Sequence, residues 1–121
     1  MGLFDKLFNR APKPGKPQEI DDAQFEQLVL ADDTPAVVDF FSTTCPPCQV
    51  MSGLLSELGP EYAGRVNVFK INVSFNPETA RMYQVQSVPT LVFFKNHRPV
   101  DKVVGLIPIM PLKQKLDSLA K

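Results

Sequence analysis

The stretch from Val37 to Cys48 constrains the fold of this chain more than any other. Apolar, β-branched and aromatic residues run from Ala36 to Phe41 and predict a buried strand. One charge, Asp39, interrupts the run. Because burying a lone carboxylate is costly, this charge must be paired, protonated or used in chemistry.

The predicted strand leads into Cys45-Pro46-Pro47-Cys48, which holds the only two cysteines of the chain. The apolar spacing of the residues that follow predicts a helix beginning at this motif. Unpaired backbone N–H groups and the positive end of the helix dipole favour a thiolate over a thiol, so the pKa of Cys45 should fall below its usual value of about 8.5. We expect Cys45 to be the nucleophile and Cys48 to attack the mixed disulfide that results.

Pro46 and Pro47 suit the first turn of a helix, although they remove two N–H donors near the thiolate. Two other interpretations of the cysteine pair remain. A permanent disulfide closing so short a loop would contribute only about 2 kcal/mol. A zinc site would need two more ligands, and only His97 and acidic residues remain to supply them. Redox chemistry without a metal is therefore the preferred interpretation.

Bulk properties exclude several functional classes. The chain has 121 residues, which fits one domain, and its 13 lysines and arginines balance 13 aspartates and glutamates. A neutral balance gives no reason to expect nucleic acid as a partner. The chain has no apolar stretch of about 18 residues and no signal peptide pattern at its start, so we expect a cytoplasmic protein. In that compartment a close cysteine pair is typically redox-active.

Periodicity predicts alternating helices and strands along most of the chain. Asp21 or Asp22 is expected to cap the first helix of the domain, and the helix after Cys45 should bury Val50, Met51 and Leu55. Gly53 suggests a bend or close packing in that helix, and Gly59-Pro60 should end it. The predicted strands cover residues 19–20, 36–41, 66–73, 91–94 and 100–104, and the predicted helices cover 22–29, 46–58, 77–83 and 109–119.

The chain is expected to divide into residues 1–18 and a domain over residues 19–121. Residues 1–10 have the pattern of a short amphipathic helix, which would dock on its own domain, contact a membrane surface or fit a partner's groove. A stiff, proline-rich linker follows it. The remaining order of elements predicts an α/β fold in which helices flank both faces of a central mixed sheet.

Four motifs, taken together, resemble the thioredoxin family over roughly residues 19–119. They are Val38-Asp39-Phe40, Cys45-Pro46-Pro47-Cys48, Val88-Pro89-Thr90 and Gly105, in this order and at family-like separations. The resemblance implies a thioredoxin fold and a thiol–disulfide oxidoreductase. It also implies that no cofactor is needed beyond the reversible Cys45–Cys48 disulfide.

The resemblance assigns roles to individual residues. Asp39 matches the buried carboxylate that accepts a proton from the second cysteine, and Lys70 matches the lysine that pairs with it. Pro89 matches a cis-proline facing the cysteines, with the backbone of Val88 pairing with an extended substrate. We expect desolvation to outweigh Lys70 and raise the pKa of Asp39. The predicted catalytic residues are Cys45, Cys48, Asp39 and Lys70, and the predicted substrate-binding residues are Thr44, Pro46, Val88, Pro89 and Gly105.

The chain also departs from the family pattern. Thr44 and Pro46 stand where thioredoxins commonly have tryptophan and glycine around the first cysteine. Phe41 replaces another common tryptophan, and Gly53 replaces the proline that kinks the helix. These positions bear on substrate choice and redox potential.

The predicted function is reduction of protein disulfides by a monomer that receives electrons from a donor resembling thioredoxin reductase. Two alternative functions remain. One is a thioredoxin-fold binding module whose cysteines regulate docking, and the other is a periplasmic oxidant or isomerase. No metal site is expected.

Overall fold

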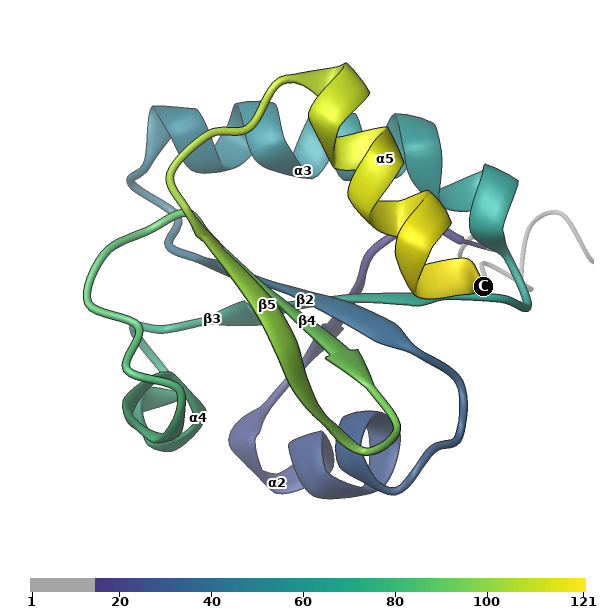
Figure 1. The fold of residues 1–121 in the computed structure, drawn as a ribbon. Helices are drawn as coiled ribbons and strands as arrows, with labels where there is room; N and C mark the ends of the chain where they lie inside the picture. The colour runs from purple at the N-terminus through teal and green to yellow at the C-terminus, as the bar shows by residue number, and fades with distance from the viewer. Residues whose placement is uncertain (1–14) are drawn as a thin grey trace, which may run out of the picture.

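A five-stranded mixed sheet forms the centre of the protein in the computed structural model, which describes residues 15–121 (Figure 1). The strand order is β1-β3-β2-β4-β5. β1, β3 and β2 run parallel, whereas β4 pairs antiparallel with β2 and β5 antiparallel with β4. The strands are β1 (Gln18–Ile20), β2 (Ala36–Phe41), β3 (Asn67–Asn72), β4 (Thr90–Lys95) and β5 (Arg98–Val104). The predicted mixed sheet is confirmed.

Helices cover both faces of this sheet, as Figure 1 shows. α3 (Pro46–Leu58) and α5 (Ile109–Ala120) lie on one face, and α2 (Asp22–Phe25) and α4 (Pro77–Met82) lie on the other. The π-helical turn η1 (Glu26–Leu30) extends α2, and the 3-10 turn η2 (Gly59–Tyr62) follows α3. The amphipathic pattern of residues 1–10 and most of the proline-rich stretch lie outside the described residues.

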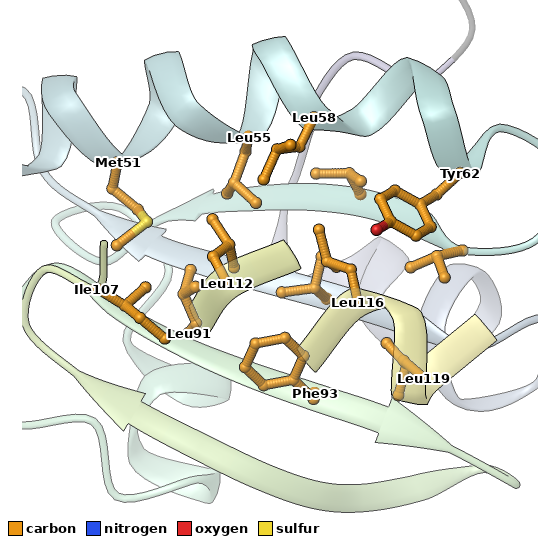
Figure 2. Packing of buried hydrophobic residues seen from close by; sticks show 13 residues of the cluster. Met51, Leu55, Leu58, Tyr62, Leu91, Phe93, Ile107, Leu112, Leu116 and Leu119 are labelled. Atoms are coloured by element: carbon orange, nitrogen blue, oxygen red, sulfur yellow. The ribbon is translucent and has the colours of Figure 1, made fainter. Parts of the chain in front are cut away.

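Alternation along the strands divides the core into two layers. Val37 of β2 packs with α3 and α5, around Met51, Leu55, Leu112 and Leu116 (Figure 2). Its neighbours Ala36, Val38 and Phe40 pack on the opposite face with residues of α2, η1 and α4. The two-residue period places Asp39 on the same face as Val37, which is the face that α3 covers. β2 therefore places the Asp39 carboxylate on the face of the sheet where the cysteine motif lies.

The structure corrects two local predictions on α3 and confirms where this helix ends. Val50 is 54% exposed, because the buried stripe follows Met51, Leu55 and Leu58 and leaves Val50 outside it. A Cβ on Gly53 would meet nothing within 4 Å, so this glycine serves no close packing. α3 ends at Leu58 as predicted, but the chain continues to turn through η2. Gly59 is needed there because its Cβ would collide with the backbone of Gly15.

Other boundaries lie close to the predictions. β3 is one residue shorter at each end than the predicted strand, and α5 extends one residue beyond Leu119. Asn96 and His97 form the turn between β4 and β5, with positive φ values of 56° and 67°. Met82, which lies within the predicted helix over residues 77–83, is 63% exposed. α4 is six residues long and ends there, so the chain leaves this side chain uncovered.

Candidate active site

Cys45 and Cys48 form a disulfide at the N-terminus of α3. Cys45 is the N-cap residue in an extended conformation, and the two Cα atoms are 5.2 Å apart. The backbone N–H of Cys48 donates to Cys45 Sγ over 3.2 Å. Cys48 lies deeper in the first turn and is 2% exposed, against 8% for Cys45. In the reduced state, this N–H and the helix dipole would stabilise a thiolate at position 45.

Pro46 and Pro47 begin α3, as their fixed φ and missing N–H groups favour. They remove two donors, but the following two N–H groups point back to Cys45. Those of Cys48 and Gln49 donate to the Cys45 carbonyl oxygen over 3.0 and 3.3 Å. The Cys48 N–H is thus the remaining backbone donor that faces Cys45 Sγ, and the first turn holds both sulfurs in place.

The loop before β4 faces the cysteines. The Val88-Pro89 peptide bond is cis, and the Val88 carbonyl oxygen lies 3.8 Å from Cys45 Sγ. The Pro89 carbonyl oxygen accepts a hydrogen bond of 2.8 Å from the backbone N–H of Gly105. Gly105 has a φ of 88°, which favours glycine. The structure therefore brings three of the predicted substrate-binding residues, Val88, Pro89 and Gly105, beside Cys45.

Asp39 is fully buried on β2, and neither of its carboxylate oxygens has a hydrogen-bond partner among the described residues. Lys70 lies opposite it in the register between β2 and β3. Burial raises the pKa of Asp39 to about 7, and the positive charge of Lys70 opposes that rise. Desolvation prevails, as expected, because the Lys70 ammonium lies over the Phe41 ring, 5.4 Å from its centroid, and forms no ion pair with Asp39 within 4.0 Å.

Comparison with known proteins agrees with this arrangement. The family model described as Thioredoxin matches residues 16–118. The chain belongs to the thioredoxin family. It is 37% identical over 101 residues to the chloroplastic M-type thioredoxin of Pisum sativum, covering 84% of this chain and 59% of that protein. It is 38% identical to Thioredoxin 1 of a Nostoc strain and 41% identical to a Staphylococcus aureus thioredoxin, each match covering 83% of this chain and 94% of the relative.

This membership and the Cys45–Cys48 disulfide support function as a thiol–disulfide oxidoreductase. The predicted thioredoxin fold and oxidoreductase class are confirmed. The roles of individual residues stay predictions, since only their positions are given by the structure. Cys45 and Cys48 are bonded to each other, Asp39 and Lys70 share one register position, and the cis-proline loop adjoins Cys45.

The other two predicted substrate-binding residues lie at the rim of the site. Thr44 and Pro46 are both exposed on either side of Cys45. A short polar side chain and a proline ring therefore replace the tryptophan and glycine that are common in the family. A protein substrate approaching Cys45 would meet these two residues first.

Sequence reasoning missed a small pocket on the Cys48 side of the motif. It has a volume of about 350 Å³ and opens between the end of β2 and the first turns of α3. Serine and threonine hydroxyls around it were not singled out, because nothing in their spacing sets them apart from ordinary loop residues. Its lining residues are Phe41, Ser42, Thr43, Cys48, Gln49, Ser52 and Lys70. The pocket gives water a route to the buried cysteine.

His97 lies away from the cysteines, as expected for a turn residue, but it is not free. Its Nδ1 is 2.6 Å from the Leu30 carbonyl oxygen and its Nε2 is 3.0 Å from Asp33. These contacts join the β4–β5 hairpin to the end of η1. Within residues 15–121, histidine, cysteine and acidic side chains form no cluster with metal-binding geometry. None of the described helices has the length and apolar character that crossing a bilayer requires.

Proposed function

We propose that this protein reduces disulfides of other proteins through the Cys45-Pro46-Pro47-Cys48 motif, with Cys45 as the attacking thiolate. The observation that carries the proposal is the position of Cys45 Sγ. It lies at the mouth of α3 and 3.8 Å from the Val88 carbonyl oxygen of the cis-proline loop, with which an extended substrate chain would pair. Cys48 is turned inward and suits the second, resolving step.

The proposed reaction has two exchange steps. The Cys45 thiolate attacks one sulfur of the substrate disulfide, so that a mixed disulfide forms and the other substrate sulfur leaves as a thiolate. Cys48 then loses its proton and attacks Cys45 Sγ, which releases the second substrate thiol and forms the Cys45–Cys48 disulfide. The substrate gains two electrons, and a donor resembling thioredoxin reductase returns two electrons to the cysteine pair.

Asp39 is proposed as the acceptor of the Cys48 proton. With a pKa of about 7, its carboxylate is basic enough to take a proton near neutral pH, when an ordinary aspartate is not. The pocket beside Cys48 opens that cysteine to solvent, and Lys70 keeps the pKa of Asp39 from rising further. Val88, Pro89 and Gly105 would align the substrate backbone, while Thr44 and Pro46 would contact its flanks.

The setting of the reaction is also part of the proposal. We infer a monomer in the cytoplasm, because a reducing compartment suits a close cysteine pair that must return to the dithiol state. The protein would need no cofactor and no metal, since the disulfide carries the two electrons. Its partners would be disulfide-containing proteins and the electron donor, without nucleic acid. Contact of residues 1–10 with a membrane surface is not required for this chemistry.

Alkylation of the reduced protein at neutral pH tests the assignment of the nucleophile. We expect a sub-stoichiometric amount of iodoacetamide to label Cys45 first, as located by mass spectrometry of the digest. Preferential labelling of Cys48 would contradict the mechanism. A Cys48→Ser variant should stay disulfide-linked to its substrates through Cys45. The wild-type protein should reduce a protein disulfide catalytically, with dithiothreitol as the electron source. A binding module would show no turnover.

A further inference from the structure

The pocket beside Cys48 opens on the opposite side of β2 from the cis-proline loop. We call it the Cys48 pocket. The sheet order places β3 on one side of β2 and β4, which follows the cis-proline loop, on the other. The pocket has Lys70 of β3 and Cys48 in its wall, whereas Cys45 and Val88 do not line it. The Cys45–Cys48 disulfide can therefore be approached from two sides, by a protein substrate on the Cys45 side and through this pocket on the Cys48 side.

The lining of the Cys48 pocket suits a small anion. Among the described residues, Lys70 is the only charged side chain that lines it. The Lys70 ammonium forms no ion pair with these residues within 4.0 Å. The hydroxyls of Ser42, Thr43 and Ser52 and the amide of Gln49 add uncharged hydrogen-bond donors. A carboxylate can accept several such bonds, and its charge complements the ammonium.

The fold holds these donors close to the second cysteine. Cys48 and Ser52 are four positions apart on α3, so their side chains are neighbours on one side of the helix. Lys70 lies across from them, with its ammonium 5.4 Å from the centroid of the Phe41 ring. The pocket volume of about 350 Å³ lies in the range of small-molecule sites. The occupant is therefore a small molecule and not a protein chain.

We propose that the Cys48 pocket binds a small thiol that carries a carboxylate, and that this thiol exchanges directly with Cys48 Sγ. The inference rests on the proposed function and gives the oxidised protein a second source of electrons. Lys70 and the hydroxyl groups hold the carboxylate. The thiolate end of the same molecule attacks the sulfur in the pocket wall, while protein substrates still react with Cys45.

The exchange has two steps. The bound thiolate attacks Cys48 Sγ, so that a mixed disulfide forms there and Cys45 leaves as a thiolate. Cys45 is the better leaving group of the two, because the Cys48 N–H donates to its Sγ over 3.2 Å and the helix dipole stabilises its charge. A second thiolate attacks the sulfur of the first molecule and releases Cys48, which takes up a proton from water. Two thiols thus become one small disulfide, and the cysteine pair gains two electrons.

Labelling of single-cysteine variants of the full-length protein tests the site in the reverse direction. Reduced Cys45→Ser is mixed with dithiodipropionate, a small disulfide with two carboxylates, or with its uncharged diamide. Mass spectrometry follows the mixed disulfide at Cys48, and each rate is divided by the rate for the same variant unfolded in urea. We expect dithiodipropionate to react about tenfold faster than the diamide, the order expected for hydrogen bonds to a charged group. In Cys48→Ser, which is labelled at Cys45, the ratio should be near one.

Two further changes in the Cys45→Ser protein test whether the pocket is responsible. Lys70→Met removes the cation, and Gln49→Glu adds a negative charge at an exposed position of the lining, so each should lower the ratio to near one or below. Lys102→Met is the matched control, because Lys102 is an exposed lysine of β5 that does not line the pocket. It should leave the ratio unchanged.

Three results would overturn the assignment of the pocket. They are equal rates for the two reagents at Cys48, a preference for dithiodipropionate that persists in Lys70→Met, and an equal preference at Cys45. Failure of the wild-type protein to reduce a protein disulfide with dithiothreitol would instead overturn the proposed function. The two failures are distinguishable, because the labelling ratio at Cys48 does not depend on turnover of a protein substrate.

Discussion

Two aspartates on opposite faces of the sheet show how differently one fold treats the same side chain. Asp22, at the start of α2, accepts hydrogen bonds from the Glu78 N–H, the Thr79 N–H and the Thr79 hydroxyl over 3.1, 2.9 and 2.6 Å. Asp39, behind the cysteine motif, accepts none from the described residues. Burial acts to raise the pKa of both carboxyls. At Asp22 the hydrogen bonds outweigh burial and lower it, whereas at Asp39 burial prevails and raises it to about 7.

The difference separates a structural acid from a candidate proton acceptor. Asp22 serves as the N-terminal cap of α4, whose own N-cap residue, Asn76, makes no side-chain cap hydrogen bond. Its charge is satisfied and stabilises the fold. Asp39 has no hydrogen-bond donor among the described residues, and in the proposed mechanism the Cys48 thiol must lose a proton. A poorly satisfied buried acid next to a reactive group is typical of a functional site.

The largest effect is expected from Asp39→Asn in the oxidised protein, in which neither cysteine titrates. The folded pKa of about 7 lies above the unfolded value, so the wild-type protein is most stable below the unfolded pKa and loses stability as pH rises toward 7. A difference of about three pKa units corresponds to roughly 4 kcal/mol. The variant should lack this loss, and urea denaturation from about pH 4 to pH 9 measures both curves. Parallel curves would show that Asp39 is a satisfied structural acid.

Asp22→Asn should have the opposite sign and a smaller size. An amide accepts fewer hydrogen bonds than a carboxylate and carries no charge at the N-terminus of α4, so we expect a loss of about 1 kcal/mol. Because the folded pKa of Asp22 is lowered, its contribution is present above the unfolded pKa and disappears as pH falls through the folded value. Urea midpoints from about pH 2 to pH 6 test this. Glu57→Ala, an exposed carboxylate of α3, is the control, and an equal loss there would refute the specific role of Asp22.

Thr79→Val tests how much one hydrogen bond contributes to the lowered pKa of Asp22. Valine keeps the shape of the buried threonine and the backbone N–H bond to Asp22 but removes the hydroxyl donor. We expect a loss of no more than about 1 kcal/mol. The pKa of Asp22 should rise toward its ordinary value, so acid destabilisation should begin at a higher pH than in the wild-type protein. Carboxyl chemical shifts during an acid titration would report that change, and an unaltered titration would contradict it.

The smallest effect is expected from Lys70→Met, which removes the charge that opposes desolvation at Asp39. The pKa of Asp39 should shift slightly upward, and the pH at which stability levels off should shift with it. Infrared or carbon NMR titration of the carboxyl group measures the shift. A downward shift would mean that Lys70 does not act on Asp39 as a positive charge.

The sequence was sufficient for features that depend on neighbouring residues. The apolar run around Asp39, the helix mouth at Cys45 and the closing helix with Leu112 and Leu116 all follow from local periodicity. Desolvation of Asp39 followed from the same run. The cis geometry of Pro89 was expected only from the family resemblance, because its residues alone do not specify it.

Features that join distant parts of the chain could not be predicted. Sequence reasoning left open whether Asp21 or Asp22 caps α2. The structure shows that Asp21 does so in a capping box with Gln24, while Asp22 caps a helix more than 50 residues away. Val50 was assigned to the buried face because helical spacing alone does not show where a neighbouring layer ends. The path of the β5–α5 connection leaves this side chain at the rim of a groove.

The bond between Asp22 and α4 also determines how this face of the molecule opens. α2 and α4 span only four and six residues, and helices this short are not stable alone. The amides of Glu78 and Thr79 are held by Asp22, so they can exchange with solvent deuterium only when α4 separates from α2. The two helices therefore unfold locally as one cooperative unit. Because α3 packs on the other face of the sheet, such an opening leaves the helix that carries the cysteine motif in place.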